Sequence, residues 1–135
     1  MREAPRVLLL GDENSGTGPL RRILSRQSRV VCAEDIPEAL SLLAEEAYDA
    51  VFCDWRFHCG TWREAVERIG ALYPELPVVV VSQSDGSEEG IQEWAAVVEA
   101  GAFDLLGWPL DEFAARSLLE HAVASGEARA LRAHA

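Results

Sequence analysis

Short apolar runs alternate with helical patterns along the whole chain. Five runs have the length and composition of buried strands, and they lie at residues 6–10, 30–32, 48–53, 78–81 and 103–106. The run at residues 78–81 is four consecutive valines. A uniformly apolar strand of this kind is typical of the centre of a parallel sheet, because helices cover both of its faces.

Helical signals follow each of these runs. The expected helices begin near Pro19, Asp35, Thr61, Ser87 and Asp111, and the last three of them end near Leu72, Ala100 and Gly126. Asp35 and Ser87 are suitable N-caps, and Gly101 is a suitable C-terminal stop. Five strands alternating with five helices predict an α/β fold with a doubly wound, five-stranded parallel sheet.

Polar side chains follow three strands that should be central neighbours in such a sheet. Asp12 and Glu13 come after the first strand, Asp54 after the third and Ser82 after the fourth. Ligands of open α/β sheets bind beyond the carboxyl ends of the strands. We therefore expect three carboxylates and one hydroxyl to meet at one edge of the sheet.

Gathered carboxylates repel one another unless a cation joins them. Mg²⁺ suits this set, because it takes oxygen ligands and is often bound through one or two carboxylates plus a phosphate. A carboxylate beside the ion can also act as a nucleophile towards phosphorus. The alternative is that Asp12, Glu13 and Asp54 are ordinary polar residues at strand ends.

Four motifs together resemble the receiver domain of bacterial two-component response regulators, and the resemblance covers essentially the whole chain. They are the acidic pair Asp12 and Glu13, the strand that ends in Asp54, the valine run that ends in Ser82, and the segment 101–110, which reads GAFDLLGWPL. That last segment most resembles receivers of nitrogen-regulator-type transcriptional activators.

The resemblance implies a flavodoxin-like strand order, 2-1-3-4-5, and a role for each of these residues. Asp54 would accept a phosphoryl group from a histidine kinase or a phosphotransfer protein. Asp12, Glu13, Asp54 and the backbone carbonyl of Arg56 would hold Mg²⁺. Ser82 would donate a hydrogen bond to the phosphoryl group. The resemblance implies a signalling domain, not an enzyme.

The sequence also departs from the family pattern. Trp108 stands where the family has a lysine, and the chain contains no lysine at all. Leu105 occupies the position of the aromatic switch residue, Gln83 replaces the small residue after Ser82, and the loop after Asp54 looks shortened. Arg56 is a candidate source of positive charge, and its side chain can equally point to solvent. The family also uses a cis peptide at the position of the Trp108–Pro109 bond.

Three functions remain open. The first is an atypical receiver that is phosphorylated on Asp54 and switches its protein contacts. The second is a pseudo-receiver that signals through protein contacts without phosphorylation. The third and least favoured is a flavodoxin-type nucleotide-binding domain, since residues 11–18 resemble a phosphate loop but lack its lysine.

Length, charge and cysteine content limit the possible domain organisation and binding partners. The chain has 135 residues and a net charge of −11, so we expect one domain that does not itself bind nucleic acid. Residues 1–126 are the expected receiver-like domain, and 127–135 either a helical tail or the start of a linker to an output domain. The three cysteines favour free thiols in the cytoplasm, and no apolar run is long enough for a membrane span.

Further expectations concern the surface. The three histidines, His58, His121 and His134, are expected there, away from any catalytic role. The large apolar residues on the last two helices are expected in the core, and any exposed subset could form a homodimer face. The residues in question are Trp94, Val97, Val98, Leu118 and Leu119.

Overall fold

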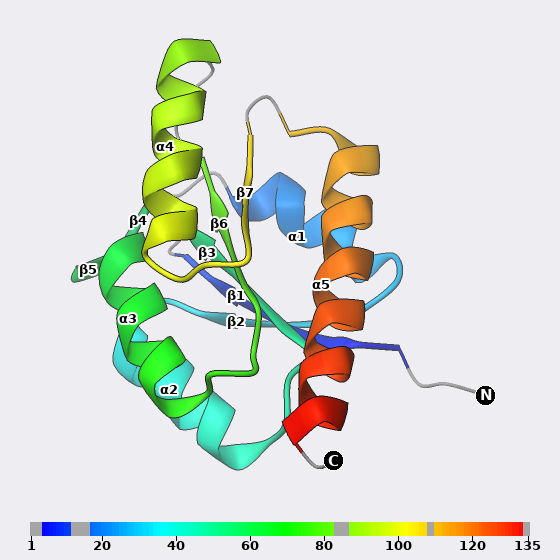
Figure 1. Ribbon diagram of the computed structural model, residues 1–135. Coiled ribbons are helices and arrows are strands. Elements are labelled where there is room, and N and C mark those ends of the chain that lie inside the picture. The colour runs from blue at the N-terminus through cyan, green and yellow to red at the C-terminus, as the bar shows by residue number, and fades with distance from the viewer. Residues whose placement is uncertain (1–3, 12–16, 83–86, 108–109, 134–135) are drawn as a thin grey trace.

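Five parallel strands form the large sheet of the protein (Figure 1). The computed structural model describes residues 4–11, 17–82, 87–107 and 110–133. The sheet consists of β1 (Arg6–Leu10), β2 (Arg29–Ala33), β3 (Ala50–Asp54), β6 (Val78–Val81) and β7 (Asp104–Leu106). Their order is β2-β1-β3-β6-β7, which confirms the predicted order 2-1-3-4-5 when these strands are numbered along the chain.

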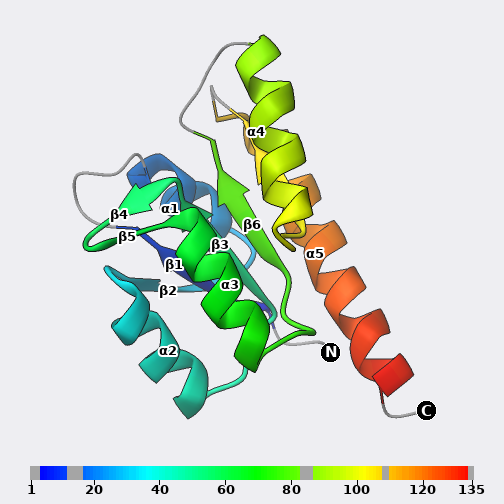
Figure 2. The ribbon, with the colours of Figure 1, turned by 60° about the vertical axis from the view of Figure 1, so that its left-hand side comes forward.

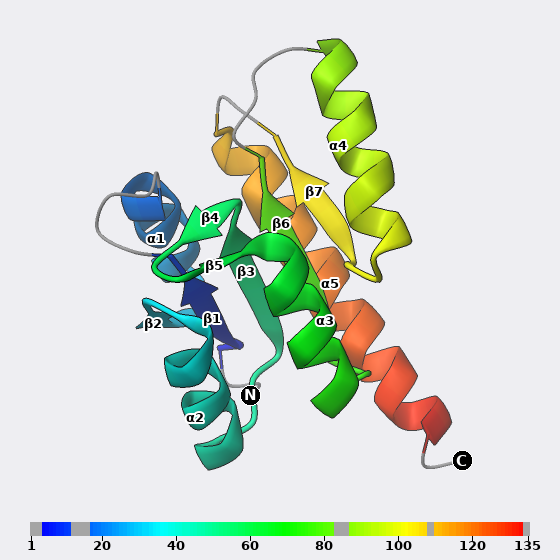
Figure 3. The ribbon, with the colours of Figure 1, turned by 90° about the vertical axis from the view of Figure 1, so that its left-hand side faces the viewer.

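Helices cover both faces of the sheet. One face packs against α1 (Thr17–Ser25) and α5 (Glu112–Ala133), and the other against α2 (Ile36–Glu45), α3 (Trp62–Leu72) and α4 (Ser87–Glu99). Figure 3 shows these layers, with α5 behind the sheet and α2 and α3 in front. The doubly wound architecture is therefore confirmed.

Alternation of side chains along the strands divides the core into two clusters. In β1, Leu8 and Leu10 join the cluster under α2, α3 and α4, whereas Val7 and Leu9 join the cluster under α1 and α5. All four residues are at most 2% exposed. A strand buried on both faces must be apolar throughout, which explains why the central strands were readable from sequence.

The predicted helix boundaries hold where local chemistry fixes them. The Asp35 side chain accepts a hydrogen bond from the Glu38 N–H at 2.9 Å and caps α2. Gly101 has a φ of 106°, and the N–H groups of Gly101 and Ala102 donate to carbonyls in the last turn of α4. This left-handed stop is one that glycine adopts without steric cost.

The last helix is longer than predicted. It continues through Gly126 to Ala133 instead of ending near Gly126. Glycine lowers helix stability by only about 1 kcal/mol relative to alanine, and the Ala- and Arg-rich residues that follow favour a helix. The division between residues 126 and 127 remains a prediction.

A small hairpin after β3 was not predicted. It consists of β4 (Arg56–Phe57) and β5 (Gly60–Thr61), paired antiparallel, and it lies beyond the end of β3 (Figure 2). The two residues of its turn are His58 and Cys59, and Cys59 has a φ of 58°. A hairpin therefore occupies the segment that looked like a shortened loop.

The expectation of a core position was wrong for two residues of α4. Trp94 is 50% exposed and Val98 38% exposed, whereas Val97 is fully buried. At 100° per residue, Trp94 and Val98 share one helical stripe with Ile91, and this stripe faces away from the sheet. On α5, Leu119 is buried and Leu118 is partly buried against the same core cluster, as expected.

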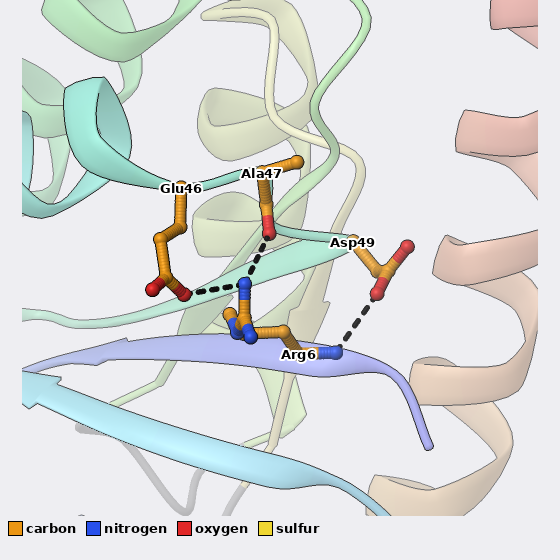
Figure 4. A network of polar contacts seen from close by, with 4 residues as sticks. All are labelled: Arg6, Glu46, Ala47 and Asp49. Carbon is orange, nitrogen blue, oxygen red and sulfur yellow. Dashed lines mark hydrogen bonds and ion pairs between the residues drawn. The ribbon is translucent and has the colours of Figure 1, made fainter. Parts of the chain in front are cut away.

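The amino-terminal edge of the sheet is held by Arg6 (Figure 4). Its guanidinium lies 2.5 Å from the Glu46 carboxylate, and its backbone N–H donates to Asp49 at 2.8 Å. These contacts join β1 to the segment between α2 and β3. A cavity of about 630 Å³ lies at this same edge, lined in part by Tyr48, Tyr73 and Pro77. This edge is opposite the one predicted to bind a ligand.

Surface and membrane expectations can be checked in part. His58 and His121 are exposed, and His134 lies outside the described residues. The three cysteines are free, with Cys32 and Cys59 exposed and Cys53 buried. Among the described helices, none combines the length and the apolar character that crossing a membrane requires.

Candidate functional site

Asp54 is a buried carboxylate at the carboxyl end of β3. It is 9% exposed, and it follows four residues that are completely buried. The parallel register sets Cys53 beside Leu10 of β1 and Asp54 beside Val81 of β6. Asp54 therefore lies where β1, β3 and β6 all end, at the edge where ligands of open α/β sheets bind.

The neighbouring backbone orients this carboxylate. The Trp55 N–H donates a hydrogen bond to Oδ1 of Asp54 at 2.8 Å. A buried carboxylate must exchange its lost water contacts for hydrogen bonds of this kind. The arrangement fixes the side chain in one orientation at the edge of the sheet.

Several residues of the predicted site lie outside the described residues. These are Asp12, Glu13, Gln83 and Trp108, together with the Trp108–Pro109 bond and most of the phosphate-like loop. Gly11, directly before Asp12, donates its N–H to the Ala33 carbonyl at 2.9 Å, so the chain leaves β1 at the edge where Asp54 lies. The convergence of three carboxylates stays a prediction, and the described residues alone contain no group of three potential metal ligands.

Ser82 directly follows β6 and is 1% exposed. Its N–H donates to the Leu106 carbonyl of β7 at 2.8 Å, which anchors the backbone between two strand ends. Its hydroxyl donates to Oε1 of Glu93 in α4, also at 2.8 Å. Ser82 thus joins the end of the sheet to a helix that covers it.

Glu93 is a residue that sequence reasoning missed. Its Oε2 atom is buried and has no hydrogen-bond partner among the described residues. Glu93 shares the inward stripe of α4 with Ala96 and Val97, at spacings of three and four residues. A glutamate on the apolar stripe of a helix was the signal that could have found it.

Cys53 and Leu105 define the apolar surroundings of the site. Burial raises the pKa of the Cys53 thiol well above 9.0, and the negative charge of Asp54 raises this pKa further. Leu105 is partly buried and packs against the cluster under α4. These two side chains therefore give the site apolar neighbours on the side of α4.

Two tryptophans that follow Asp54 in the chain form an aromatic pair. The rings of Trp55 and Trp62 lie 5.3 Å apart between centroids, and the Arg63 guanidinium lies 4.9 Å from the centre of the Trp62 ring. The side chain of Arg56 is exposed and forms no ion pair within the described part of the chain. Of the two orientations left open for Arg56, the structure shows the one towards solvent.

Comparison with known proteins identifies relatives over most of the chain. The model of the response regulator receiver domain matches residues 7–120. The hydrogenase transcriptional regulatory protein HoxA of Cupriavidus necator is 31% identical over 100 residues, which are 74% of this chain and 20% of HoxA. The response regulator protein PilR of Pseudomonas aeruginosa is 32% identical over 91 residues, 67% of this chain and 20% of PilR. The chain thus spans about a fifth of the length of either relative.

Solved structures agree with this result. NtrX from Brucella abortus superposes with a TM-score of 0.83 at 23% identity, covering 98% of this chain and 29% of NtrX. The receiver domain of NtrX gives a TM-score of 0.77 at 25% identity, covering 87% of this chain and 98% of that domain. The resemblance predicted from the sequence motifs, including that to receivers of transcriptional activators, is confirmed.

Proposed function

Because the chain belongs to the response regulator receiver domain family of two-component systems, we propose that it works by accepting a phosphoryl group on Asp54. The observation that carries this proposal is the position of Asp54, a buried and oriented carboxylate at the carboxyl end of β3 with Ser82 at the end of the adjacent strand. Polar residues buried in so apolar a region require a reason, because burying a polar group is costly.

The reaction is a phosphoryl transfer. A carboxylate oxygen of Asp54 attacks the phosphorus of a phosphohistidine, the P–N bond breaks, and the histidine leaves with its electron pair and takes up a proton. The product is an acyl phosphate, which carries nearly two negative charges and three strong acceptor oxygens. The hydroxyl of Ser82 is suited to donate to one of those oxygens.

The residues present fit Mg²⁺ by the chemistry of their donors. Asp12, Glu13, Asp54 and the backbone carbonyl of Arg56 would supply oxygen ligands, which are those that Mg²⁺ prefers. When bound, the ion neutralises charge on the transferring phosphoryl group. Two members of this set are described, Asp54 and Arg56, and the Asp54 carboxylate accepts a hydrogen bond from the Trp55 N–H at 2.8 Å.

The partners follow from this chemistry. A histidine kinase or a phosphotransfer protein would supply the phosphoryl group. Since the chain spans about a fifth of HoxA and PilR, a C-terminal output domain is the expected receiver of the signal. A homodimer is a second expected assembly, because Ile91, Trp94 and Val98 expose an apolar stripe on α4.

A pseudo-receiver is the second candidate. Two observations favour it: Trp108 replaces the lysine that would pair with the phosphoryl group, and the hydroxyl of Ser82 is already bonded to Glu93. A missing cation removes a charge-assisted contact, typically about twice as strong as a neutral hydrogen bond. In this alternative the same α4 surface signals without a change at Asp54.

Intact-mass spectrometry tests the proposal. The protein is incubated with Mg²⁺ and acetyl phosphate, and we expect one added phosphoryl group in the wild type and none in Asp54→Asn. Asp49→Asn is the matched control, because Asp49 lies before β3 at the amino-terminal edge of the sheet, and asparagine keeps an acceptor for the Arg6 N–H. If Asp54→Asn still gains the group, the acceptor is another residue. If neither acetyl phosphate nor a phosphorylated histidine kinase modifies the wild type, the domain is a pseudo-receiver.

A further inference from the structure

The bond between Ser82 and Glu93 sits at the one described hydroxyl of the proposed site. Ser82 is 1% exposed, and its hydroxyl donates to Oε1 of Glu93 at 2.8 Å. An ionised carboxylate only accepts hydrogen bonds, so the hydrogen of this bond comes from the serine. A serine hydroxyl has one hydrogen, and it cannot donate to Glu93 and to a phosphoryl oxygen at the same time.

Resting on the proposed phosphorylation of Asp54, we infer that Glu93 is a positioning residue that holds the Ser82 hydroxyl on α4 in the unphosphorylated protein and is released when a phosphoryl group takes over that hydrogen. Glu93 thus opposes phosphorylation and connects it to α4. The hydrogen bond between Ser82 and Glu93 takes the place of the family's aromatic switch residue, because Leu105 occupies that position in this chain.

The surroundings of Glu93 increase the cost of breaking its hydrogen bond to Ser82. Its Oε2 atom is buried without a hydrogen-bond partner among the described residues, while its Oε1 atom accepts a hydrogen bond from the Ser82 hydroxyl. Losing a partner in such a place costs more than losing one at the surface. Once Ser82 turns to the phosphoryl group, the half-buried Glu93 loses this partner and gains by turning towards water, which changes how α4 packs on the end of β6.

The rest of α4 is suited to report the release. Its amino-terminal part extends beyond the carboxyl ends of β6 and β7 (Figure 3), and its outer stripe exposes Ile91, Trp94 and Val98. From this stripe Trp94 donates its indole N–H to Asp104, the first residue of β7, at 3.1 Å, which is a second polar contact between α4 and the sheet. A change at Ser82 can therefore reach the exposed apolar stripe through α4 alone.

A double-mutant cycle tests the inference. The variants are Glu93→Gln, Ser82→Ala and both together, and the readout is the initial rate of phosphoryl gain from acetyl phosphate with Mg²⁺, followed by intact mass. Glutamine keeps the shape but turns a charge-assisted bond into a neutral one, so we expect Glu93→Gln to take up the group about three- to tenfold faster than the wild type. In the Ser82→Ala background the same substitution should change nothing.

Three outcomes would overturn this inference. An equal acceleration in both backgrounds means that Glu93 acts only by charge repulsion, without Ser82. An equal acceleration by Glu99→Gln, which removes an exposed charge from the same helix, means that the position on α4 is irrelevant. A Glu93→Gln protein with the wild-type rate also contradicts the inference.

Hydrogen exchange of the unphosphorylated protein separates this inference from the proposed function. Ser82→Ala and Glu93→Gln should each increase amide exchange in α4, and the double variant no more than the larger single effect. Unchanged amide exchange in α4 would contradict the positioning role of Glu93 even if Asp54 is phosphorylated. Conversely, an inert Asp54 in the wild type and in all variants sinks the proposed function, whatever the exchange shows.

Discussion

Cys53 and Asp54 are neighbours in β3, but their side chains lie in different surroundings. The thiol is completely buried in the core under α2, α3 and α4, while the carboxylate reaches the edge of the sheet. Burial is the main cause that raises the pKa of Cys53, and the charge of Asp54 is the second. One residue along the strand thus separates a core position from a position at the edge of the sheet, because β3 ends there.

The raised pKa of Cys53 predicts a loss of stability at alkaline pH. Between the ordinary value of 9.0 and the higher folded value, the folded protein keeps a proton that the unfolded chain has released. This stabilisation is complete below pH 9 and is lost as the pH rises, by at most about 1.4 kcal/mol per pH unit. Urea unfolding at pH 7.5, 9 and 10 should show the decline.

Two cysteine variants test its origin. Cys53→Ala should be less stable at pH 7.5, because it leaves a cavity, but its free energy of unfolding should decline less above pH 9. Cys32→Ala removes an exposed thiol and should keep the wild-type decline. Equal slopes in the wild type and in Cys53→Ala would exclude Cys53 as the cause.

The hairpin of β4 and β5 depends on one glycine. A Cβ atom at Gly60 would lie 2.7 Å from Cε2 of Phe57 and 3.3 Å from Cδ1 of Ile36. The Phe57 ring is 6% exposed and packed in the core, so it has little room to move. The hairpin approaches the core more closely than any side chain would allow.

Gly60→Ala should therefore destabilise the protein by about 1–3 kcal/mol, the usual cost of overpacking a core. Gly70→Ala is the matched control, because nothing lies within 4 Å of a Cβ atom at Gly70 in α3. That variant should gain up to about 1 kcal/mol, since alanine favours a helix. Thermal and urea unfolding measure both, and a neutral Gly60→Ala would show that the Phe57 ring yields.

Elements with a long periodic pattern were predictable, and those without one were not. The apolar runs located the five strands, and the strand ends located Asp54 and Ser82 without any knowledge of their contacts. Two strands of two residues each are too short for any periodicity, so β4 and β5 were missed. On α4, apolar residues occupy two stripes, and pattern alone could not tell that the stripe with Glu93 faces inward while Trp94 faces out.

At the scale of the whole molecule, negative charge dominates. The net charge is −11, and the described ion pairs, Arg6 with Glu46 and Arg26 with Glu112, neutralise few of the 23 acidic residues. Self-repulsion of this size weakens the folded state at low salt. A phosphoryl group on Asp54 would add nearly two further charges. Cations are therefore expected to stabilise the protein in two ways, by general screening and by binding at the edge of the sheet.

Matched ionic strength separates these two effects. Raising NaCl from low concentration should increase the free energy of unfolding of the wild type and of Asp54→Asn alike, because screening acts on all surface charges. Replacing NaCl by millimolar MgCl₂ at the same ionic strength should stabilise only the wild type, by about 1–2 kcal/mol, the gain for a ligand at roughly ten times its Kd or more. A chelator should reverse this gain. An equal gain in Asp54→Asn would show that Mg²⁺ acts on the surface, and the predicted ligand role of Asp54 would then be wrong.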